Sequence, residues 1–174
     1  MAVSQNGWPA LDASSPLLTT WNIPTKEGVV RLRLRNGSAG FLLCHFVLWW
    51  AETIEPVYGK VLDDWGWAYR PIRGQSTGLS NHASGTAADV NATHHPLGTL
   101  TLSRWQVVKI RARILIYGGA LRWGGSYTGR VDQMHVEINT SLGGAEKVAK
   151  RLMKSPRGKR ILDANPLQAA VILS

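Results

Sequence analysis

The hydrophobic pattern predicts a strand at residues 30–35, where apolar and basic residues alternate without exception. A period of two places three aliphatic side chains on one face and three basic side chains on the other, namely Val30, Leu32 and Leu34 against Arg31, Arg33 and Arg35. Asn36-Gly37 ends the strand. The arginine face is either a solvated strand surface or a docking surface for an anionic polymer.

A helix is predicted from about Ala39 to Ile54, with Ser38 as its N-cap. Its residues are apolar almost all the way round, which is typical of a helix at the centre of a domain. Cys44 and His45 lie within this run, and we expect both to be packed core residues.

The rest of the chain mixes short strands and helices. We predict strands at residues 65–70, 121–123 and 134–138, and helices that begin at Thr101 or Ser103 and just after Gly143-Gly144. Gly118-Gly119 stops the first of these helices, whose inner face is expected to hold Trp105, Val108, Ala112 and Leu115. Pro156 is expected to end the last helix, which carries a basic face of Lys147, Lys150, Arg151 and Lys154.

These elements show no βαβ regularity, so we expect an α+β fold with a small antiparallel sheet flanked by helices. The 174 residues suit a single domain. Within it we distinguish an irregular N-terminal arm (residues 1–25) anchored by Trp8 and Trp21, a core (26–142), and a basic C-terminal helix and tail (143–174).

The chain is strongly basic, with a formal net charge of +9 and a pI near 10.2. This favours an anionic partner, and nucleic acid, anionic cell-wall polymers and peptidoglycan carboxylates all qualify. The single cysteine, Cys44, excludes an internal disulfide and a cysteine-rich zinc cluster. The first 25 residues contain no lysine or arginine, so we expect no secretory signal and synthesis in a cytoplasm. We also expect no membrane insertion, because the apolar run from Gly40 to Ala51 is too short to span a bilayer.

Candidate metal ligands occur in two short stretches. His82 and Asp89 stand seven positions apart across Ser84-Gly85, and His135 follows much later in the chain. Two imidazoles and one carboxylate are a common donor set for a catalytic zinc, which keeps a fourth position open for water. Seven residues would place His82 and Asp89 on opposite faces of an unbroken strand, so Ser84-Gly85 must turn the chain for both to converge.

Other polar residues nearby suggest hydrolysis. Asp132 precedes His135 by three positions and could take a proton from the attacking water and return it to a leaving amine. Arg70 could donate to the developing oxyanion or hold a substrate carboxylate. The alternative role for Arg70 is a structural salt bridge. Glu137 shares the face of His135 and is expected to support that ligand rather than bind metal. His94-His95 is expected to be a solvated loop pair rather than a second part of the metal site.

Three stretches together resemble a known family: residues 67–71 (WAYRP), 80–89 (SNHASGTAAD) and 132–137 (DQMHVE). They are similar to the zinc D-alanyl-D-alanine carboxypeptidases, including the L-alanyl-D-glutamate endopeptidase branch found in phage endolysins. The resemblance covers about residues 65–138 and implies one zinc per chain, held by His82, Asp89 and His135, with Asp132 as base and Arg70 steadying the substrate carbonyl. It implies a small α+β fold shared with hedgehog signalling domains, and substrate contacts from the polar side chains Tyr69, Gln75 and Ser80.

The sequence departs from that family at two places. The interval between Arg70 and His82 is shorter than in many members, which puts the role of Gln75 in doubt, and Val136 stands where an aromatic residue is often found.

The resulting hypothesis is a zinc peptidase that cuts bacterial peptidoglycan, reaching the wall as an endolysin made in the host cytoplasm or as part of a virion. One alternative is a module of the same fold that contains zinc and binds a wall or protein ligand without cutting. A second is nucleic-acid binding, which the basic charge and eight tryptophans favour, but no recognition motif accompanies them and we expect no nucleic-acid partner. Which peptide bond is cut stays open.

Overall fold

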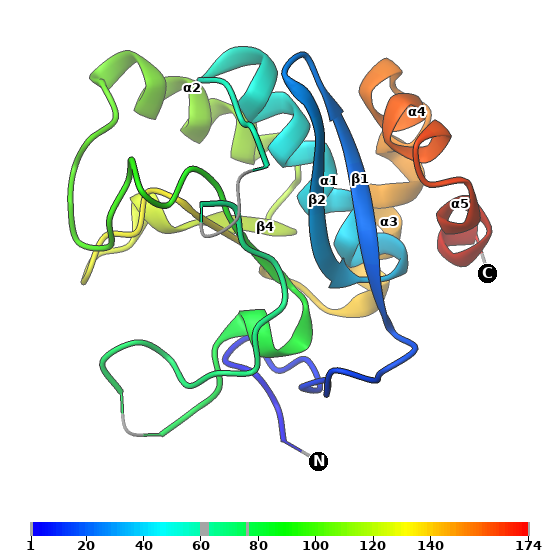
Figure 1. Ribbon diagram of the computed structural model, residues 1–174, viewed down its shortest axis with the longest axis horizontal. Coiled ribbons are helices and arrows are strands. Elements are labelled where there is room, and N and C mark those ends of the chain that lie inside the picture. Colours follow the sequence, from blue (N-terminus) through cyan, green and yellow to red (C-terminus); the bar gives the residue numbers. More distant parts are fainter. Residues whose placement is uncertain (1, 60–62, 76, 174) are drawn as a thin grey trace.

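The computed structural model describes residues 2–59, 63–75 and 77–173, and within these ranges it has an α+β fold with two small antiparallel sheets and five helices (Figure 1). This confirms the predicted fold class. In chain order the elements are β1 (Leu18–Thr25), β2 (Gly28–Arg35), α1 (Gly37–Thr53), the 3₁₀ turn η1 (Asn81–Ser84), β3 (Ala87–Asp89), α2 (Arg104–Leu115), β4 (Leu121–Trp123), the 3₁₀ turn η2 (Gly124–Ser126), β5 (His135–Ile138), α3 (Leu142–Leu152), α4 (Pro156–Asp163) and α5 (Pro166–Leu173).

The β1–β2 hairpin confirms the predicted strand at residues 30–35. The aliphatic face of β2 is fully buried, and it lies beside Trp21 and Ile23 of β1, which are buried as well. The expectation that residues 1–25 are irregular is wrong for Leu18–Thr25, because these residues pair with β2 along its whole length. The prediction missed this strand because Asn22 and Pro24 interrupt its apolar pattern.

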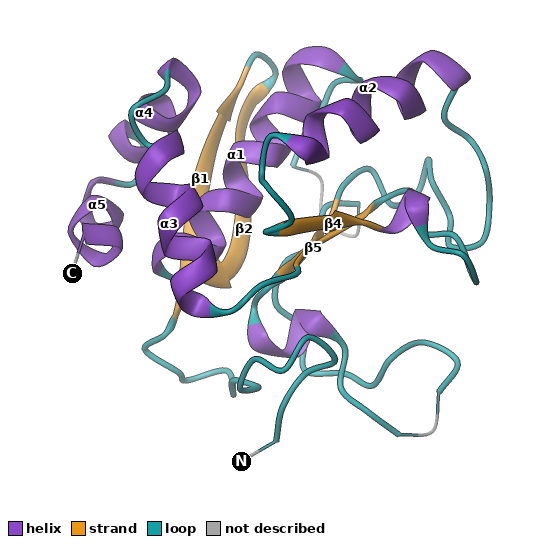
Figure 2. Ribbon diagram, turned by 180° about the vertical axis from the view of Figure 1, so that it is seen from behind, coloured by secondary structure: helices purple, strands orange, loops and turns teal. Residues whose placement is uncertain are grey.

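Helix α1 is the buried centre of the molecule, as its apolar composition predicts. It contacts the hairpin on one side and α3, α4 and α5 on the other, and Figure 2 shows it between these layers. The helix begins earlier than predicted: Asn36 precedes it without a capping side chain, and Ser38 lies inside the first turn. Ser38 Oγ is buried and, within the described ranges, has no hydrogen-bond partner, so it is not an N-cap.

The second sheet has the strand order β3-β5-β4 and is antiparallel throughout. The predicted strands at residues 121–123 and 134–138 are β4 and β5. In the register of β3 and β5, Ala88 lies opposite Val136 and Asp89 lies opposite His135. The register therefore brings one candidate ligand from each strand side by side.

Three further expectations are wrong. Residues 65–70 form no strand; Trp65 makes only an isolated bridge to Asp89. The helix with the basic face, α3, does end before Pro156, but it is not the last helix. Pro156 begins α4, where a missing N–H costs nothing at the first helical position, and α5 follows. Helix α2 does start at Ser103 with a complete capping box, yet its predicted inner face is exposed to solvent, and Ile110 is its fully buried residue.

The arginine face of β2 stays partly open to solvent: Arg31 and Arg33 are exposed, and Arg35 is half-buried. Arg33 stacks over Trp67 and donates to the Ala13 carbonyl oxygen, and Arg35 stacks over Trp8. Trp8 is buried and donates its indole N–H to the Thr140 carbonyl, 2.8 Å away, so it anchors the arm as predicted. No helix among the described residues is both long and apolar enough to cross a membrane.

Candidate metal centre

The first candidate ligand, His82, is presented by the η1 turn. Ser80 caps this turn, with its side chain accepting from the His82 backbone N–H, and Gly85 closes it in a left-handed conformation at φ 69°. A side chain at Gly85 would also collide with the Arg35 backbone of β2. A glycine is thus required at this point, and the chain reverses here as the spacing of His82 and Asp89 predicts.

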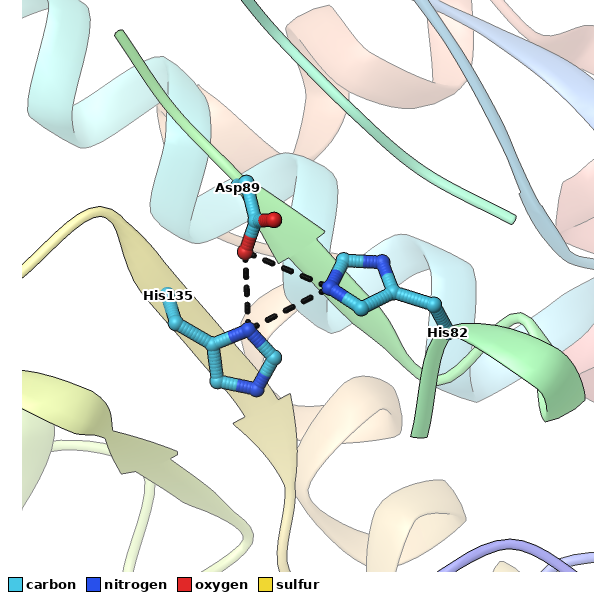
Figure 3. Close-up of side chains that lie close together, drawn as sticks. All are labelled: His82, Asp89 and His135. Carbon is cyan, nitrogen blue, oxygen red and sulfur yellow. Dashed lines mark hydrogen bonds and ion pairs between the residues drawn. The ribbon is translucent and has the colours of Figure 1, made fainter. Parts of the chain in front are cut away.

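The side chains of His82, Asp89 and His135 meet in the interior, as Figure 3 shows. Asp89 Oδ1 lies 3.2 Å from His82 Nε2 and 2.8 Å from His135 Nδ1, and the two nitrogens are 3.3 Å apart. All three residues are buried, and one donor atom of each lies within 4.8 Å of the others. Two imidazole nitrogens and a carboxylate oxygen that converge in this way fit a divalent cation such as Zn²⁺.

The hydrogen bonds on the far side of each imidazole support the same conclusion. His82 Nδ1 lies 2.6 Å from the Gly66 carbonyl oxygen, which can only accept, so Nδ1 carries the hydrogen and Nε2 is left with its lone pair. His135 Nε2 lies 3.0 Å from Glu137 Oε2 and donates to it, which leaves Nδ1 facing Asp89. Metal-binding histidines typically donate their second N–H to a carbonyl or carboxylate in this way.

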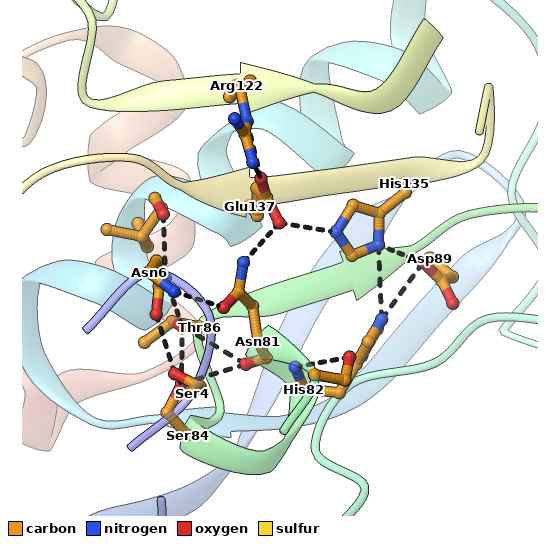
Figure 4. Close-up of polar contacts among 12 residues, drawn as sticks. Ser4, Asn6, Asn81, His82, Ser84, Thr86, Asp89, Arg122, His135 and Glu137 are labelled. Atoms are coloured by element: carbon orange, nitrogen blue, oxygen red, sulfur yellow. Dashed lines mark hydrogen bonds and ion pairs between the residues drawn. The ribbon is translucent and has the colours of Figure 1, made fainter. Parts of the chain in front are cut away.

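Glu137 belongs to a polar network that reaches the N-terminal arm (Figure 4). Its carboxylate accepts from Asn81 Nδ2 at 2.5 Å and from Arg122 Nε at 2.7 Å, in addition to His135. The Asn6 backbone N–H in turn donates to Asn81 Oδ1 at 2.8 Å. The network holds the Glu137 carboxylate in place, and this carboxylate in turn orients the His135 ring.

Sequence reasoning missed Asn81, Arg122 and Asn6. Arg122 pairs with Glu137 in the register of β4 and β5, and opposite charges are favoured in such cross-strand pairs, but this signal can be used only once the register is known. Asn6 carries no such signal, since its partner lies 75 positions away.

The pKa values of Asp89 and His135 are both shifted by their neighbours. Burial would raise the pKa of Asp89, but the neighbouring His82 and His135 lower it well below 3.8. Burial would lower the pKa of His135, but its hydrogen bonds to Asp89 and Glu137 raise it from 6.5 to about 10. The two carboxylates therefore favour the protonated His135 ring, and a metal ion bound at Nδ1 would replace the proton there.

Asp132 lies just before β5 and faces the same cavity. Its backbone is held close to Gly124, where an added side chain would collide with the Asp132 carbonyl oxygen. Burial, assisted by repulsion from Asp89, raises the pKa of Asp132 from 3.8 to about 6, although attraction to His135 opposes the shift. Asp132 Oδ1 is buried and has no hydrogen-bond partner among the described residues, so an acceptor is available for a bound water or substrate group.

A cavity of about 570 Å³ opens onto these groups. Of the sequence-predicted residues, it is lined by Arg70, Gln75, Ser80, Asp89, Asp132, His135 and Glu137. Tyr69 lies outside this lining and is 56% exposed, so the structure does not bring it to the site. Tyr127, which sequence reasoning did not single out, also lines the cavity.

His95 corrects the expectation of a solvated histidine pair. His94 is exposed, but His95 is buried, with its ring nitrogens 2.6 Å from Thr101 Oγ1 and 2.6 Å from Glu55 Oε1. It therefore ties the loop before α2 to the end of α1 and is no part of the His82, Asp89 and His135 group.

Comparison with known proteins places this site in context. Residues 73–138 match a family model described as D-alanyl-D-alanine carboxypeptidase. The match covers less than half of the chain but includes His82, Asp89, Asp132, His135 and Glu137. No curated protein and no solved structure matches the chain. The segment that contains the candidate metal ligands is thus similar to a peptidase family.

Proposed function

We propose that this protein is a zinc metallopeptidase that hydrolyses a peptide bond in the stem peptide or cross-link of bacterial peptidoglycan. The observation that carries the proposal is the convergence of His82, Asp89 and His135 on one point. Asp132 faces the same cavity, and its Oδ1 has no hydrogen-bond partner among the described residues. The similarity of residues 73–138 to D-alanyl-D-alanine carboxypeptidases supports a peptide substrate of this kind.

In this proposal His82, Asp89 and His135 hold one Zn²⁺, which when bound would polarise the scissile carbonyl and make water more acidic. Asp132 acts as general base and then general acid. Its pKa of about 6 suits both roles near neutral pH, because the carboxylate is ionised before the reaction yet basic enough to take a proton. It then returns that proton to the leaving amine nitrogen.

Arginines at the cavity support an acidic peptide as substrate. Arg70, Arg73 and Arg130 line it, and none of the three forms a salt bridge within the described part of the chain. Arg122 also lines it but is neutralised by Glu137. In the proposed mechanism Arg70 donates to the carbonyl oxygen as negative charge develops there, and a free carboxylate of the wall peptide is held nearby.

We further propose that the protein acts at the bacterial cell wall, as a phage lysin or as a virion component. Anionic wall polymers would be additional partners for a chain with a net charge of +9.

The test compares Asp132→Ala with the wild type and with Asp163→Ala, which removes an exposed carboxylate of α4. We expect wild type and Asp163→Ala to contain one zinc per chain and to release peptides from purified peptidoglycan. Asp132→Ala should retain zinc and the unfolding temperature but lose hydrolysis by at least about a hundredfold, the usual effect of removing a general base. Mass spectrometry of the released fragments would identify the bond that is cut.

Three results would contradict the proposal. Wild-type turnover in Asp132→Ala would overturn the role of Asp132 as base. Stoichiometric zinc without any peptidoglycan hydrolysis in the wild type would favour a module that binds the wall without cutting it. Activity that survives removal of the metal by a chelator would exclude zinc catalysis altogether.

A further inference from the structure

Helix α2 has two apolar faces, of which the protein covers one. At 3.6 residues per turn, Val107, Ile110 and Ile114 share the side that packs on the core. A second set lies on the opposite side at the spacing that predicted an inner face, and it consists of Trp105, Val108, Ala112 and Leu115. Its large members are 55%, 59% and 78% exposed, for Trp105, Val108 and Leu115 respectively. We call this second set the α2 outer face.

Basic residues border the α2 outer face on both sides. By the helical period, Arg104 and Arg111 lie along one edge and Lys109 along the other, and all three are exposed. Lys109 Nζ lies 5.5 Å from the ring centroid of Trp105. From Arg104 to Leu115 the helix contains no acidic residue, so its positive charge is uncompensated locally.

The basic border continues onto α3. Arg151 of α3 donates to the Ile116 carbonyl oxygen, which follows the last residue of α2, at a distance of 2.6 Å. Three exposed lysines accompany Arg151 on or next to that helix, Lys147, Lys150 and Lys154. Basic side chains of α2 thus border the exposed apolar stripe on both sides, and Arg151 lies at its C-terminal end.

We propose that the α2 outer face docks onto the surface of an anionic lipid bilayer. Trp105, Val108 and Leu115 would enter the interfacial region, and the flanking arginines and lysines would contact phosphate headgroups. The helix lies at the periphery of the molecule in both ribbon views, where a flat surface can reach it (Figures 1 and 2). A hydrophilic polyanion such as DNA or a wall polymer would use the charges but would leave the apolar stripe in water, so these fit less well.

A second copy of the chain fits this face poorly. In a symmetric contact across α2, both copies would bring only positive charges to the border, from Arg104, Lys109 and Arg111, and like charges at an interface oppose association. The occupant therefore has to supply negative charge as well as apolar surface, and a bilayer with anionic headgroups supplies both.

The proposal does not rest on the proposed peptidase function. No residue of α2 lines the cavity at the metal centre, so docking can be measured in the Asp132→Ala variant as well as in the wild type. Failure of one proposal leaves the other standing.

The experiment is co-sedimentation of the full chain with vesicles of phosphatidylglycerol and phosphatidylcholine, compared with vesicles of phosphatidylcholine alone. We expect binding to the anionic vesicles that weakens as salt is added. Leu115→Ser should lower the partition coefficient about tenfold, from the transfer free energy of one leucine side chain. Arg111→Gln should lower it about fivefold, the usual contribution of one basic residue near an anionic surface.

The matched controls are Leu167→Ser and Lys159→Gln. Leu167 on α5 is 80% exposed, against 78% for Leu115, so Leu167→Ser makes the same exchange away from α2. Lys159 is an exposed cation on α4, so Lys159→Gln removes one positive charge, as Arg111→Gln does, away from α2. We expect both controls to bind like the wild type, and all four variants to keep the wild-type unfolding temperature.

Three outcomes would overturn the proposal. The first is absence of wild-type binding to the anionic vesicles, and the second is an equal loss in Leu115→Ser and Leu167→Ser. The third is a dimer in sedimentation velocity that Leu115→Ser abolishes, which would assign the face to a second copy of the chain.

Discussion

Replacing Glu137 by glutamine tests whether the network behind His135 determines metal binding. The Glu137 carboxylate accepts hydrogen bonds from four donor groups: His135 Nε2, Asn81 Nδ2, and Arg122 Nε and Nη2. Glutamine keeps one acceptor oxygen but presents an amide NH₂ on its other side. Whichever way the amide is turned, an N–H group then faces the donors of either His135 or Arg122.

The size of the effect follows from these contacts. A hydrogen bond to a charged group contributes about 1.5–3 kcal/mol, and the variant loses at least one of this kind. The His135 ring also loses the negative charge that makes its Nδ1 basic. Changes of this type lower metal affinity by about 10- to 100-fold, which corresponds to about 1.4–2.8 kcal/mol and agrees with the first figure.

The assay is competition for Zn²⁺ against a fluorescent chelator at neutral pH. We expect Glu137→Gln to bind zinc about 10- to 100-fold more weakly than the wild type and His135→Ala to lose tight binding. Glu146→Gln makes the same charge change on α3, away from the cavity lining, and should bind like the wild type. Unfolding of the metal-free proteins should be recorded in parallel, so that a loss of fold is not mistaken for a loss of affinity.

Unchanged zinc affinity in Glu137→Gln, with His135→Ala impaired, would refute the argument that the Glu137 contact controls His135. Unchanged affinity in both variants would show that the metal is bound elsewhere.

Two further predictions concern stability. Gly40→Ala should destabilise the protein by about 3 kcal/mol, because the new Cβ would collide with the Arg35 carbonyl oxygen and the Trp21 indole. Gly143→Ala, the control, should be neutral or stabilising, because nothing lies within 4 Å of its new Cβ. Equal unfolding temperatures of the two variants would contradict this prediction. Burial, reinforced by the charges of Arg113, Arg157 and Arg151, lowers the pKa of His45 from 6.5 to about 3. Between pH 6.5 and about pH 3, His45 is therefore protonated in the unfolded chain but not in the folded chain. The free energy of unfolding falls with acidification across this range, by about 1.4 kcal/mol per pH unit from this group. Denaturant unfolding at several pH values should show a slope shallower by that amount in His45→Gln, and equal slopes would exclude His45 as the source.

The metal centre shows how far sequence reasoning reaches. The spacing of His82 and Asp89 requires a turn between them, and Gly85 provides it in the left-handed conformation that glycine adopts freely. The alternation around His135 predicts that His135 and Glu137 share a face, and in the structure they are hydrogen-bonded. Both inferences concern neighbours along the chain, whose relative directions are set by local geometry.

The contacts that complete the site depend on the pairing of distant segments. Asn6 reaches Asn81 only because the N-terminal arm crosses the domain, and Arg122 reaches Glu137 only because β4 pairs with β5 in one particular register. A different register would have left the same residues apart.

Helix α2 shows the same difference between what the sequence predicts and what only the tertiary structure decides. Its sequence by itself predicted a start at Thr101 or Ser103 and grouped Trp105, Val108, Ala112 and Leu115 on one side of the helix. The structure selects Ser103, where a capping box forms between residues three positions apart. Only the tertiary structure decided that Ile110 is covered and Leu115 is exposed. The physical reason is that periodicity states which side chains share a side of a helix, whereas the side that is buried depends on where the rest of the chain has already packed.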